Sequence, residues 1–271
     1  MYKLFRKIYS IIFSNNTFLQ KINNRVLDLA LSAKGYNNFR DFHESGEKFF
    51  VKKYLANNST KLCIDIGANE GNFTSLLLEE TSSKVISFEP LPSTYKTMLK
   101  QLRSQYTDEH IDRCVFINKG VGAKSEILPI YYNEKLTTHS SFSQDVKEID
   151  YVEYNNKVDV EVVSLDEFCK LNSICEIDFI KIDTEGFEKE VFEGALETFS
   201  SVKPKYIQIE YNWHHLFRNT SLNFFAKKLT DYNVYQLTYN SMRRVDTKHP
   251  FSNIYLFSNF VFVRKDCDKI E

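Results

Sequence analysis

Hydrophobic positions divide the chain into a helical beginning and a longer part built from short apolar runs. Residues 1–57 carry apolar side chains at helical spacing, as in "RVLDLALSAKGYNNF", where a glycine marks the stop. From residue 61 the runs shorten to "KLCIDI", "KVISFE", "CVFINKG", "IDFIKID" and "KYIQIE", most of them separated by helical segments. Repeated strand–helix units predict a mostly parallel sheet with helices on both faces.

Two further segments alternate between apolar and polar residues. "EILPIYY" and "KVDVEVVS" are typical of antiparallel or edge strands, and a polar loop, "NEKLTTHSSFSQD", separates them. Near the end, "NVYQLTY" and "NFVFVRK" predict a closing strand pair. We therefore expect an N-terminal helical extension over residues 1–57 and one α/β domain over residues 58–271.

Composition narrows the class of protein. With 271 residues, of which 42% are hydrophobic, the chain can build one substantial core. Its 35 basic and 36 acidic residues give a net charge of -1, which does not support a nucleic-acid partner. Five cysteines without a CxxC pair suggest neither a disulfide framework nor a zinc site, so we expect reduced thiols in a cytoplasmic protein.

The N-terminus, "MYKLFRKIYSIIF", mixes basic and apolar residues. Its apolar run is shorter than the ~20 residues that a membrane-spanning helix needs. No small-residue cleavage site follows, which argues against a signal peptide. Two interpretations stay open: residues 1–20 rest on the inner face of a membrane as a basic amphipathic helix, or they pack on their own domain or a partner subunit. The oligomeric state is not indicated.

The stretch "CIDIGANEGNF" carries the first candidate chemistry. Gly67 and Gly71 follow the first strand, at the carboxyl end where ligands bind in open α/β sheets. Glycines let the backbone approach a ligand closely. Glu89 ends the second strand, where a carboxylate can accept hydrogen bonds from both hydroxyls of a ribose. Together these features indicate a cofactor that contains adenosine.

Two classes of cofactor compete for this corner. Nicotinamide dinucleotides prefer G-x-G-x-x-G, with the diphosphate at the helix N-terminus. Here the spacing is Gly67-x-x-x-Gly71, and Asn69 stands between them. Asp65, two residues before Gly67, would repel a diphosphate but suits the sulfonium and amino groups of S-adenosylmethionine. The electrostatics therefore favour S-adenosylmethionine over NAD.

Three stretches, "CIDIGANEGNF", "VISFEPLPSTYKTML" and "IDFIKIDTEGFEKEVFEGA", resemble the signatures of the FkbM-type methyltransferases over roughly residues 60–212. The resemblance implies a Rossmann-like class I methyltransferase fold with a mostly parallel seven-stranded sheet. It also implies O-methylation, commonly of sugars or secondary metabolites. By position, it assigns the cofactor site to Asp65, Gly67, Asn69, Gly71 and Glu89. Asn118, at the exit of the third strand, is a further candidate.

A second group of acids follows the strand "IDFIKID". Asp183 stands at its carboxyl end and is our first candidate for the general base or the acceptor anchor; Glu185, on the same loop, is the second. Lys181 shares a strand face with Asp183. A buried ammonium needs a partner, which Asp65, Asp183 or Glu210 could supply. The helix dipole gives Glu185 a structural explanation as well.

Histidines and a metal are the remaining chemical alternatives. His139 lies in the polar loop and could fold over the active site, and His214 and His215 follow the fifth strand. Three acids, Asp183, Glu185 and Glu210, would suit Mg²⁺, but nothing fixes their spacing, so a divalent metal stays an alternative that the sequence does not favour.

Three functions therefore stay open. The first is an S-adenosylmethionine-dependent O-methyltransferase that acts on a hydroxyl, most often of a carbohydrate or glycan. The second is a nicotinamide-dependent sugar-nucleotide enzyme, against which Asp65 and the missing middle glycine argue. The third is a non-catalytic partner subunit that keeps the methyltransferase fold. The sequence does not identify the acceptor.

Overall fold

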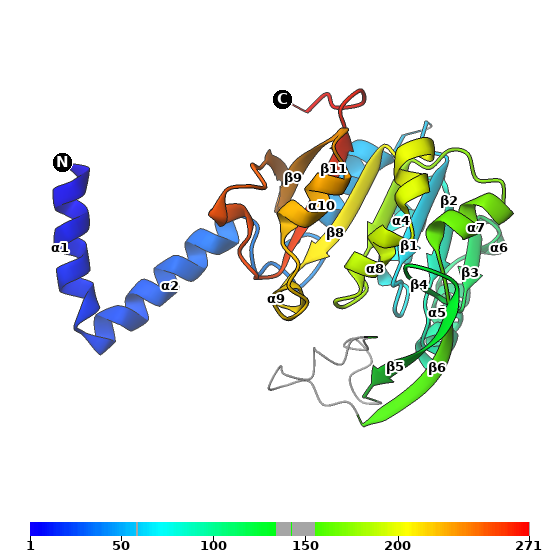
Figure 1. The fold of residues 1–271 in the computed structure, drawn as a ribbon, viewed down its shortest axis with the longest axis horizontal. Helices are drawn as coiled ribbons and strands as arrows, with labels where there is room; N and C mark the ends of the chain where they lie inside the picture. Colours follow the sequence, from blue (N-terminus) through cyan, green and yellow to red (C-terminus); the bar gives the residue numbers. More distant parts are fainter. Residues whose placement is uncertain (58, 134–141, 143–154, 271) are drawn as a thin grey trace.

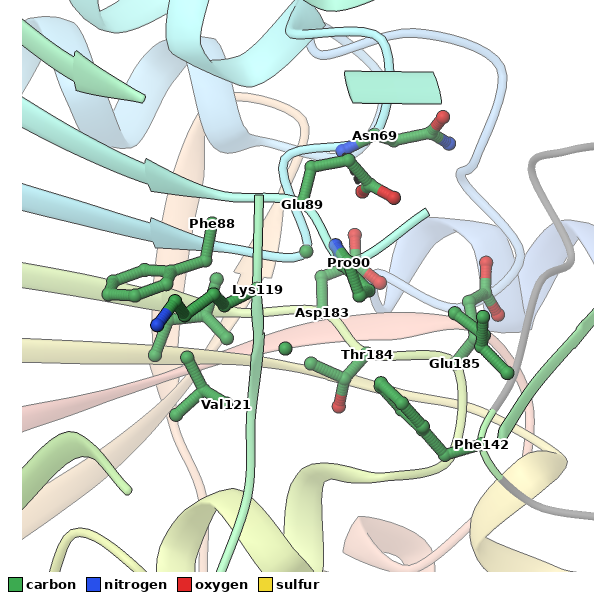
Figure 2. A pocket seen from close by; sticks show the side chains of 14 residues that line it. Asn69, Phe88, Glu89, Pro90, Lys119, Val121, Phe142, Asp183, Thr184 and Glu185 are labelled. Carbon is green, nitrogen blue, oxygen red and sulfur yellow. Dashed lines mark hydrogen bonds between the residues drawn. The ribbon is translucent and has the colours of Figure 1, made fainter. Parts of the chain in front are cut away.

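The computed structural model describes residues 1–57, 59–133, 142 and 155–270. Its main sheet has the strand order β10-β9-β11-β8-β7-β1-β2-β3. Five neighbouring strands pair in parallel: β1 (Leu62–Ile66), β2 (Lys84–Phe88), β3 (Cys114–Ile117), β7 (Phe179–Ile182) and β8 (Tyr206–Tyr211). Their carboxyl ends therefore meet at one edge, where the side chains drawn in Figure 2 gather.

The C-terminal strands of the main sheet include the closing strand pair that the sequence predicts. β11 (Ser258–Arg264) lies antiparallel between β8 and β9 (Tyr232–Thr238). β10 (Ser241–Arg244) follows β9 through a two-residue turn and pairs back on it as an edge strand. The expected mostly parallel α/β fold is confirmed, and β10 brings the sheet to eight strands rather than seven.

A second, three-stranded sheet accompanies the main one. It contains β4 (Gly120–Val121), β5 (Glu126–Tyr132) and β6 (Asn156–Val163), in the order β4-β6-β5. β5 and β6 pair antiparallel, as their alternating pattern predicts. In Figure 1 these two strands extend away from the main sheet, beyond the carboxyl ends of its parallel strands.

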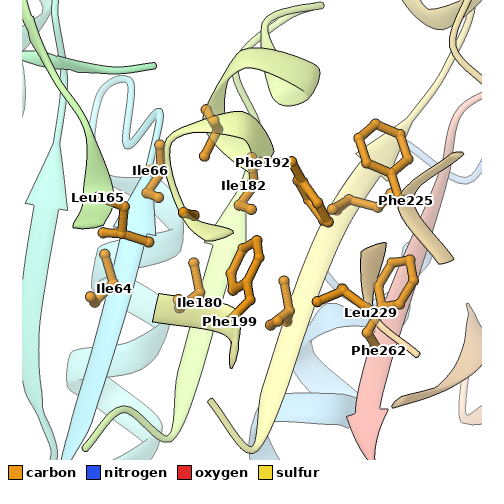
Figure 3. Close-up of a cluster of buried hydrophobic side chains, with 14 of the residues drawn as sticks. Ile64, Ile66, Leu165, Ile180, Ile182, Phe192, Phe199, Phe225, Leu229 and Phe262 are labelled. Atoms are coloured by element: carbon orange, nitrogen blue, oxygen red, sulfur yellow. The ribbon is translucent and has the colours of Figure 1, made fainter. Parts of the chain in front are cut away.

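Helices cover both faces of the main sheet. Successive side chains of each strand point to opposite sides, and on both sides apolar side chains are buried by helices. On one face, Ile64, Ile66, Ile180 and Ile182 pack against helical side chains such as Phe192 (Figure 3). The elements of this face are α7 (Leu165–Leu171), α8 (Glu188–Glu193), a π-helical turn (Thr198–Val202), α9 (His214–Phe217) and α10 (Leu222–Lys228). The other face carries α3 (Glu47–Phe50), a π-helical turn (Val51–Leu55), α4 (Asn72–Glu80) and α5 (Pro92–Gln105), with α6 (Asp108–Ile111) after them.

The N-terminal region divides into two parts. In α1 (Tyr2–Ser14) and α2 (Thr17–Ala33), both wholly described, no residue is buried. These helices project from the domain in Figure 1, so α1 does not pack on its own domain. Residues 36–55 instead join the packed domain, with Tyr36, Phe50 and Leu55 fully buried. None of the described helices is long and apolar enough to cross a bilayer.

Candidate active site

Gly67 begins the loop between β1 and α4 and ties together three strand ends. Its N–H donates to the carbonyl oxygen of Phe88 at 3.0 Å. Its φ of +85° is disfavoured for other residues, and a Cβ here would lie 1.8 Å from the carbonyl oxygen of Asp183. Only glycine therefore lets this loop sit against the loop that follows β7.

Glu89, directly after β2, is the best-defined carboxylate of the site. It is 4% exposed. Oε2 accepts a hydrogen bond from the N–H of Asn69 at 2.9 Å, and Oε1 accepts one from the N–H of Leu91 at 2.9 Å. Burial raises the pKa of Glu89 to about 7 in spite of these bonds, and the nearby Asp65 adds to the rise. Each oxygen keeps a further lone pair for a ligand.

A cleft of about 560 Å³ of open space lies at these strand ends (Figure 2). Predicted site residues from three loops meet along it: Gly67, Asn69, Glu89, Asp183 and Glu185. Residues that the sequence did not single out complete the lining, among them Pro90, Lys119, Val121, Ile130, Phe142 and Thr184. The structure thus brings together three of the six predicted cofactor residues and both predicted acids.

Asp65 does not line this cleft. It is fully buried on the α4 side of β1, and its Oδ2 accepts a hydrogen bond from the Thr74 hydroxyl at 2.7 Å. Burial raises the pKa of Asp65 to about 6. Asp65 stays a predicted cofactor residue, but its carboxylate does not line this cleft, because α4 packs over that face of the strand. Its charge acts on the cleft through its electrostatic interactions with Glu89 and Asp183.

Gly71 and Asn118 also serve the surrounding framework rather than the lining of the cleft. Gly71 is the residue before α4, with φ +87°, and a Cβ there would lie 2.8 Å from the side chain of Met98 on α5. The Asn118 side-chain amide donates to the carbonyl oxygens of Glu89 and Pro90 at 2.8 and 3.0 Å. Gly71 therefore permits helix packing, and Asn118 fixes the turn that presents Glu89.

Lys181 and Asp183 form the predicted buried ion pair. Nζ of Lys181 lies 2.6 Å from Oδ2 of Asp183, and the lysine is 5% exposed. Burial lowers the pKa of Lys181, but Asp183, Glu47, Asp65 and Glu210 outweigh burial and raise it. Sequence reasoning missed Glu47, because an acid in the first turn of a helix is ordinarily explained by the helix dipole.

Glu185 forms the second pair of the site, with His214. Oε2 of Glu185 lies 3.1 Å from Nδ1 of His214, which is 1% exposed. Burial lowers the pKa of His214, but Glu185, with Glu188 and Asp183, outweighs burial and raises it. Glu185 also adopts φ +52°, a strained conformation for a residue other than glycine. The loop therefore holds this carboxylate in a defined position at the cleft.

Neighbouring polar groups support these pairs. Glu188 is buried, and its Oε1 accepts hydrogen bonds from the N–H and the hydroxyl of Thr184 at 2.8 and 3.0 Å. His215 accepts a hydrogen bond at Nδ1 from the N–H of Asn212, and burial lowers its pKa to about 3. His215 therefore stays neutral and has a structural role. His139 lies outside the described residues.

A second, wider cleft opens on the other side of Asp183, with about 1360 Å³ of open space. Asp183 lines both clefts. The second cleft also contains Lys181 and Glu210, and residues 39–48 supply one of its walls. Two aromatic rings, Phe39 and Phe257, stand edge to face at 5.9 Å along it. Across the described chain, no group of three or more histidine, cysteine, aspartate or glutamate side chains is arranged to hold a metal ion.

Comparison with known proteins gives the family. Residues 65–237 match the model of the Methyltransferase FkbM domain, which is well over half of the chain. Methyltransferase FkbM from Methylobacillus flagellatus KT is similar with 18% identity and a TM-score of 0.48, over 82% of this chain and 49% of that one. This chain thus spans about half the length of that protein.

Two other solved structures are similar at lower identity. The precorrin-6y C5,15-methyltransferase of Geobacter metallireducens GS-15 is 8% identical, with a TM-score of 0.43, over 84% of this chain and 91% of that one. The methyltransferase domain of a bacterial protein, CtHen1-CN, is 15% identical, with a TM-score of 0.42, over 82% and 98%. No curated protein matches. On the family model, this chain belongs to the Methyltransferase FkbM domain family.

Proposed function

We propose that this protein is an S-adenosylmethionine-dependent O-methyltransferase that acts on a hydroxyl of a carbohydrate or glycan. Family membership supports the cofactor and the reaction. The observation that carries the proposal is the charge of the first cleft, where Glu89, Asp183 and Glu185 stand against the single cation Lys119 among the described lining residues. Such a lining favours a sulfonium and an ammonium and repels a diphosphate.

The donor groups of the cleft fit this cofactor. Both oxygens of Glu89 keep acceptor capacity towards the two hydroxyls of a ribose. Oδ1 of Asn69 is buried and accepts no hydrogen bond from any described residue, so it offers an acceptor at the same loop. When bound, S-adenosylmethionine supplies an electrophilic methyl carbon attached to a positively charged sulfur.

Asp183 is assigned to the acceptor hydroxyl. In the transfer, the acceptor oxygen forms a bond to the methyl carbon, the bond from that carbon to sulfur breaks, and the hydroxyl proton leaves. Asp183 reaches both clefts and is oriented by Lys181, so it can hold the hydroxyl and take its proton. Glu185, oriented by His214, is the second candidate for this base.

Positioning of the acceptor should contribute more to the rate than removal of its proton. Positioning can supply ~7–11 kcal/mol of a barrier, whereas a general base adds ~10²–10⁴-fold, which is about 3–5 kcal/mol. The ion pairs Lys181–Asp183 and His214–Glu185 orient the two candidate bases, which serves positioning first. We therefore expect removal of the base to slow the enzyme without abolishing its activity.

The second cleft is proposed to hold the acceptor. Phe39 is 64% exposed and stands against Phe257, so a sugar ring can stack on this aromatic wall. Glu210 lies deeper in the same cleft and can accept a hydrogen bond from a sugar hydroxyl. Burial raises the pKa of Glu210 well above its ordinary value, with Asp183 and Glu185 adding to the rise.

The experiment combines binding and transfer. Calorimetry should show that S-adenosylhomocysteine binds and NADH does not. Methyl-label transfer from S-adenosylmethionine into fractionated glycan pools should then find the acceptor. Asp183→Asn should still bind S-adenosylhomocysteine and lose about 10²–10⁴-fold in turnover.

Each alternative has its own result. Binding of NADH without S-adenosylhomocysteine would return the nicotinamide enzyme to first place. Binding of S-adenosylhomocysteine with no transfer into any pool would indicate a non-catalytic subunit. Unchanged turnover in Asp183→Asn would exclude Asp183 as the base. All five cysteines are free, which supports the proposal of a cytoplasmic enzyme.

A further inference from the structure

The two N-terminal helices, α1 and α2, form an arm that exposes apolar side chains. Leu4 and Phe5 are each 65% exposed, and Ile11 is 61% exposed. On α2, Phe18 and Leu29 are 68% and 70% exposed. Fully covering such a side chain contributes about 1.5–3 kcal/mol, so this arm leaves a large stabilising contribution unused in the isolated chain.

The apolar and basic residues of α1 occupy opposite sides of the helix. Phe5, Ile8 and Ile12 follow the i, i+3, i+7 spacing that places side chains on one face. Arg6, Lys3 and Lys7 fall on the other side, and α1 contains no aspartate or glutamate. A helix of this kind suits a surface that is apolar below and negatively charged above.

The arm has a fixed elbow. Oδ1 of Asn16 caps α2 by accepting hydrogen bonds from the N–H groups of Phe18 and Leu19 at 3.0 and 3.1 Å. The Gln20 side chain donates to the carbonyl oxygen of Phe13 at 2.6 Å, and the Tyr9 hydroxyl donates to Asn23. These bonds orient the two helices relative to each other.

The arm is also anchored firmly at its base. Asn38 and Ser32 bond to each other through side chain and backbone. The N–H of Asn37 donates to the carbonyl oxygen of Phe257 at 2.8 Å, and the Tyr36 hydroxyl donates to that of Phe251 at 2.8 Å. The arm is thus joined to the domain through defined contacts while its own faces stay uncovered (Figure 1).

We propose that this arm docks the protein on an anionic lipid bilayer. The apolar face enters the boundary between headgroups and acyl chains, about 5–10 Å deep, and the basic residues lie at the headgroup phosphates. Charge complementarity selects this occupant. The arm carries five basic residues against one acid, so an anionic surface attracts the arm, whereas the rest of the chain is net acidic and adds no such attraction.

Docking of the arm also places the second cleft relative to the bilayer. That the second cleft holds the acceptor rests on the proposed function, whereas docking itself does not. The base of the arm bonds to Phe257, and Phe257 and Phe39 line that cleft. A docked arm therefore brings the acceptor cleft towards the bilayer. The acceptor class that fits this placement is a glycan carried on a lipid.

Vesicle co-sedimentation of the full chain tests the electrostatic part. The protein should bind vesicles of phosphatidylcholine with phosphatidylglycerol and bind weakly to phosphatidylcholine alone. The triple variant Lys3→Gln, Arg6→Gln, Lys7→Gln should lose about a hundredfold in affinity, since each basic residue near an anionic surface contributes roughly a factor of five. Binding should also weaken as salt rises towards about 1 M, where the Debye length is ~3 Å.

A matched control removes the same charge elsewhere. The triple variant Lys96→Gln, Lys100→Gln, Arg103→Gln changes three exposed basic residues of α5. It should bind vesicles like the unmodified protein, and thermal melts should show that every variant is folded. Equal loss of affinity in the two triple variants would overturn the arm as the docking element.

A second pair of variants tests the apolar face. Ile8→Asp and Ser10→Asp each place one carboxylate in α1, the first on the apolar side and the second on the polar side. Ile8→Asp should bind vesicles at least tenfold more weakly than Ser10→Asp. Equal binding would refute insertion of the apolar face. Absence of vesicle binding together with self-association that Ile8→Asp abolishes would assign the arm to a second copy of the chain.

Discussion

Glu89→Gln is the change that best separates stability from binding. In the folded protein, burial raises the pKa of this carboxyl from 4.5 to about 7. Between these values the folded state holds the proton more tightly than the unfolded state, so the free energy of unfolding falls as pH rises through this window. At 1.36 kcal/mol per pKa unit, the full penalty above pH 7 is about 3 kcal/mol.

Glutamine cannot ionise, so the variant should lack this pH dependence. Its amide group also disturbs one of the backbone hydrogen bonds that Glu89 accepts, which costs about 1–3 kcal/mol at every pH. The quantity to compare is therefore the change in the free energy of unfolding with pH, in which the constant loss cancels. Relative to the unmodified protein, Glu89→Gln should gain about 3 kcal/mol in the free energy of unfolding between pH 4 and pH 8.

Cofactor binding should change in the opposite direction. If the ribose hydroxyls donate to the ionised carboxylate, S-adenosylhomocysteine should bind about tenfold more weakly at pH 6, where about a tenth of Glu89 is ionised. In Glu89→Gln the affinity at pH 8 should fall by about 10–100-fold, the value of charged hydrogen bonds, and it should no longer depend on pH in this window.

Urea unfolding across the pH range and calorimetry with S-adenosylhomocysteine measure both quantities. Glu70→Gln is the control, because it removes a carboxylate from the same loop at a position that does not line the cleft. Its unfolding profile and affinity should stay close to those of the unmodified protein. The reasoning fails if Glu89→Gln unfolds with the original pH dependence and binds S-adenosylhomocysteine as tightly as before.

Three further changes test the packing and charge of the site. Gly67→Ala should lower the melting temperature far more than Gly71→Ala, because its Cβ meets a backbone oxygen at 1.8 Å whereas that of Gly71 meets a methionine side chain at 2.8 Å; equal losses in thermal melts would contradict this. Lys181→Met should lower the free energy of unfolding by about 3–5 kcal/mol. The loss should be larger at pH 8 than at pH 6, because more of the surrounding carboxylates are ionised at pH 8. Denaturant unfolding at both pH values measures this difference. Glu185→Gln should lower the pKa of His214 in an NMR titration, since burial then acts without its ion-pair partner; an unchanged titration would rule out the pair.

Local sequence predicted correctly those residues of the first cleft that directly follow a strand. Gly67 and Glu89 each follow an apolar run directly, so the pattern alone placed them at the carboxyl edge of the sheet. The same holds for Asp183 and Glu185 after β7. The parallel pairing of β1 with β2 and β7 then made their meeting unavoidable.

Asp65 shows where local reasoning stops. Alternation places it on the face of β1 opposite Ile64 and Ile66, but does not say what covers that face. In the structure α4 covers that face, and the carboxylate accepts a hydrogen bond from Thr74 instead of lining the cleft. Glu47 is the converse case: its Oε1 accepts a hydrogen bond from Gln208, a residue far along the sequence, and its charge helps to keep Lys181 protonated.

The sequence by itself determined the order of the strands and helices, the parallel core of the sheet and the corner formed by Gly67 and Glu89, because side-chain periodicity and turn chemistry are local properties. Only the tertiary structure decided which carboxylates line a cleft and which are sealed, that Lys181 pairs with Asp183 and Glu185 with His214, and that the N-terminal arm stays uncovered. Burial and charge pairing depend on which helices and strands pack against each other. This packing brings together residues that are far apart in the sequence, and the sequence pattern around each of them does not reveal the contact.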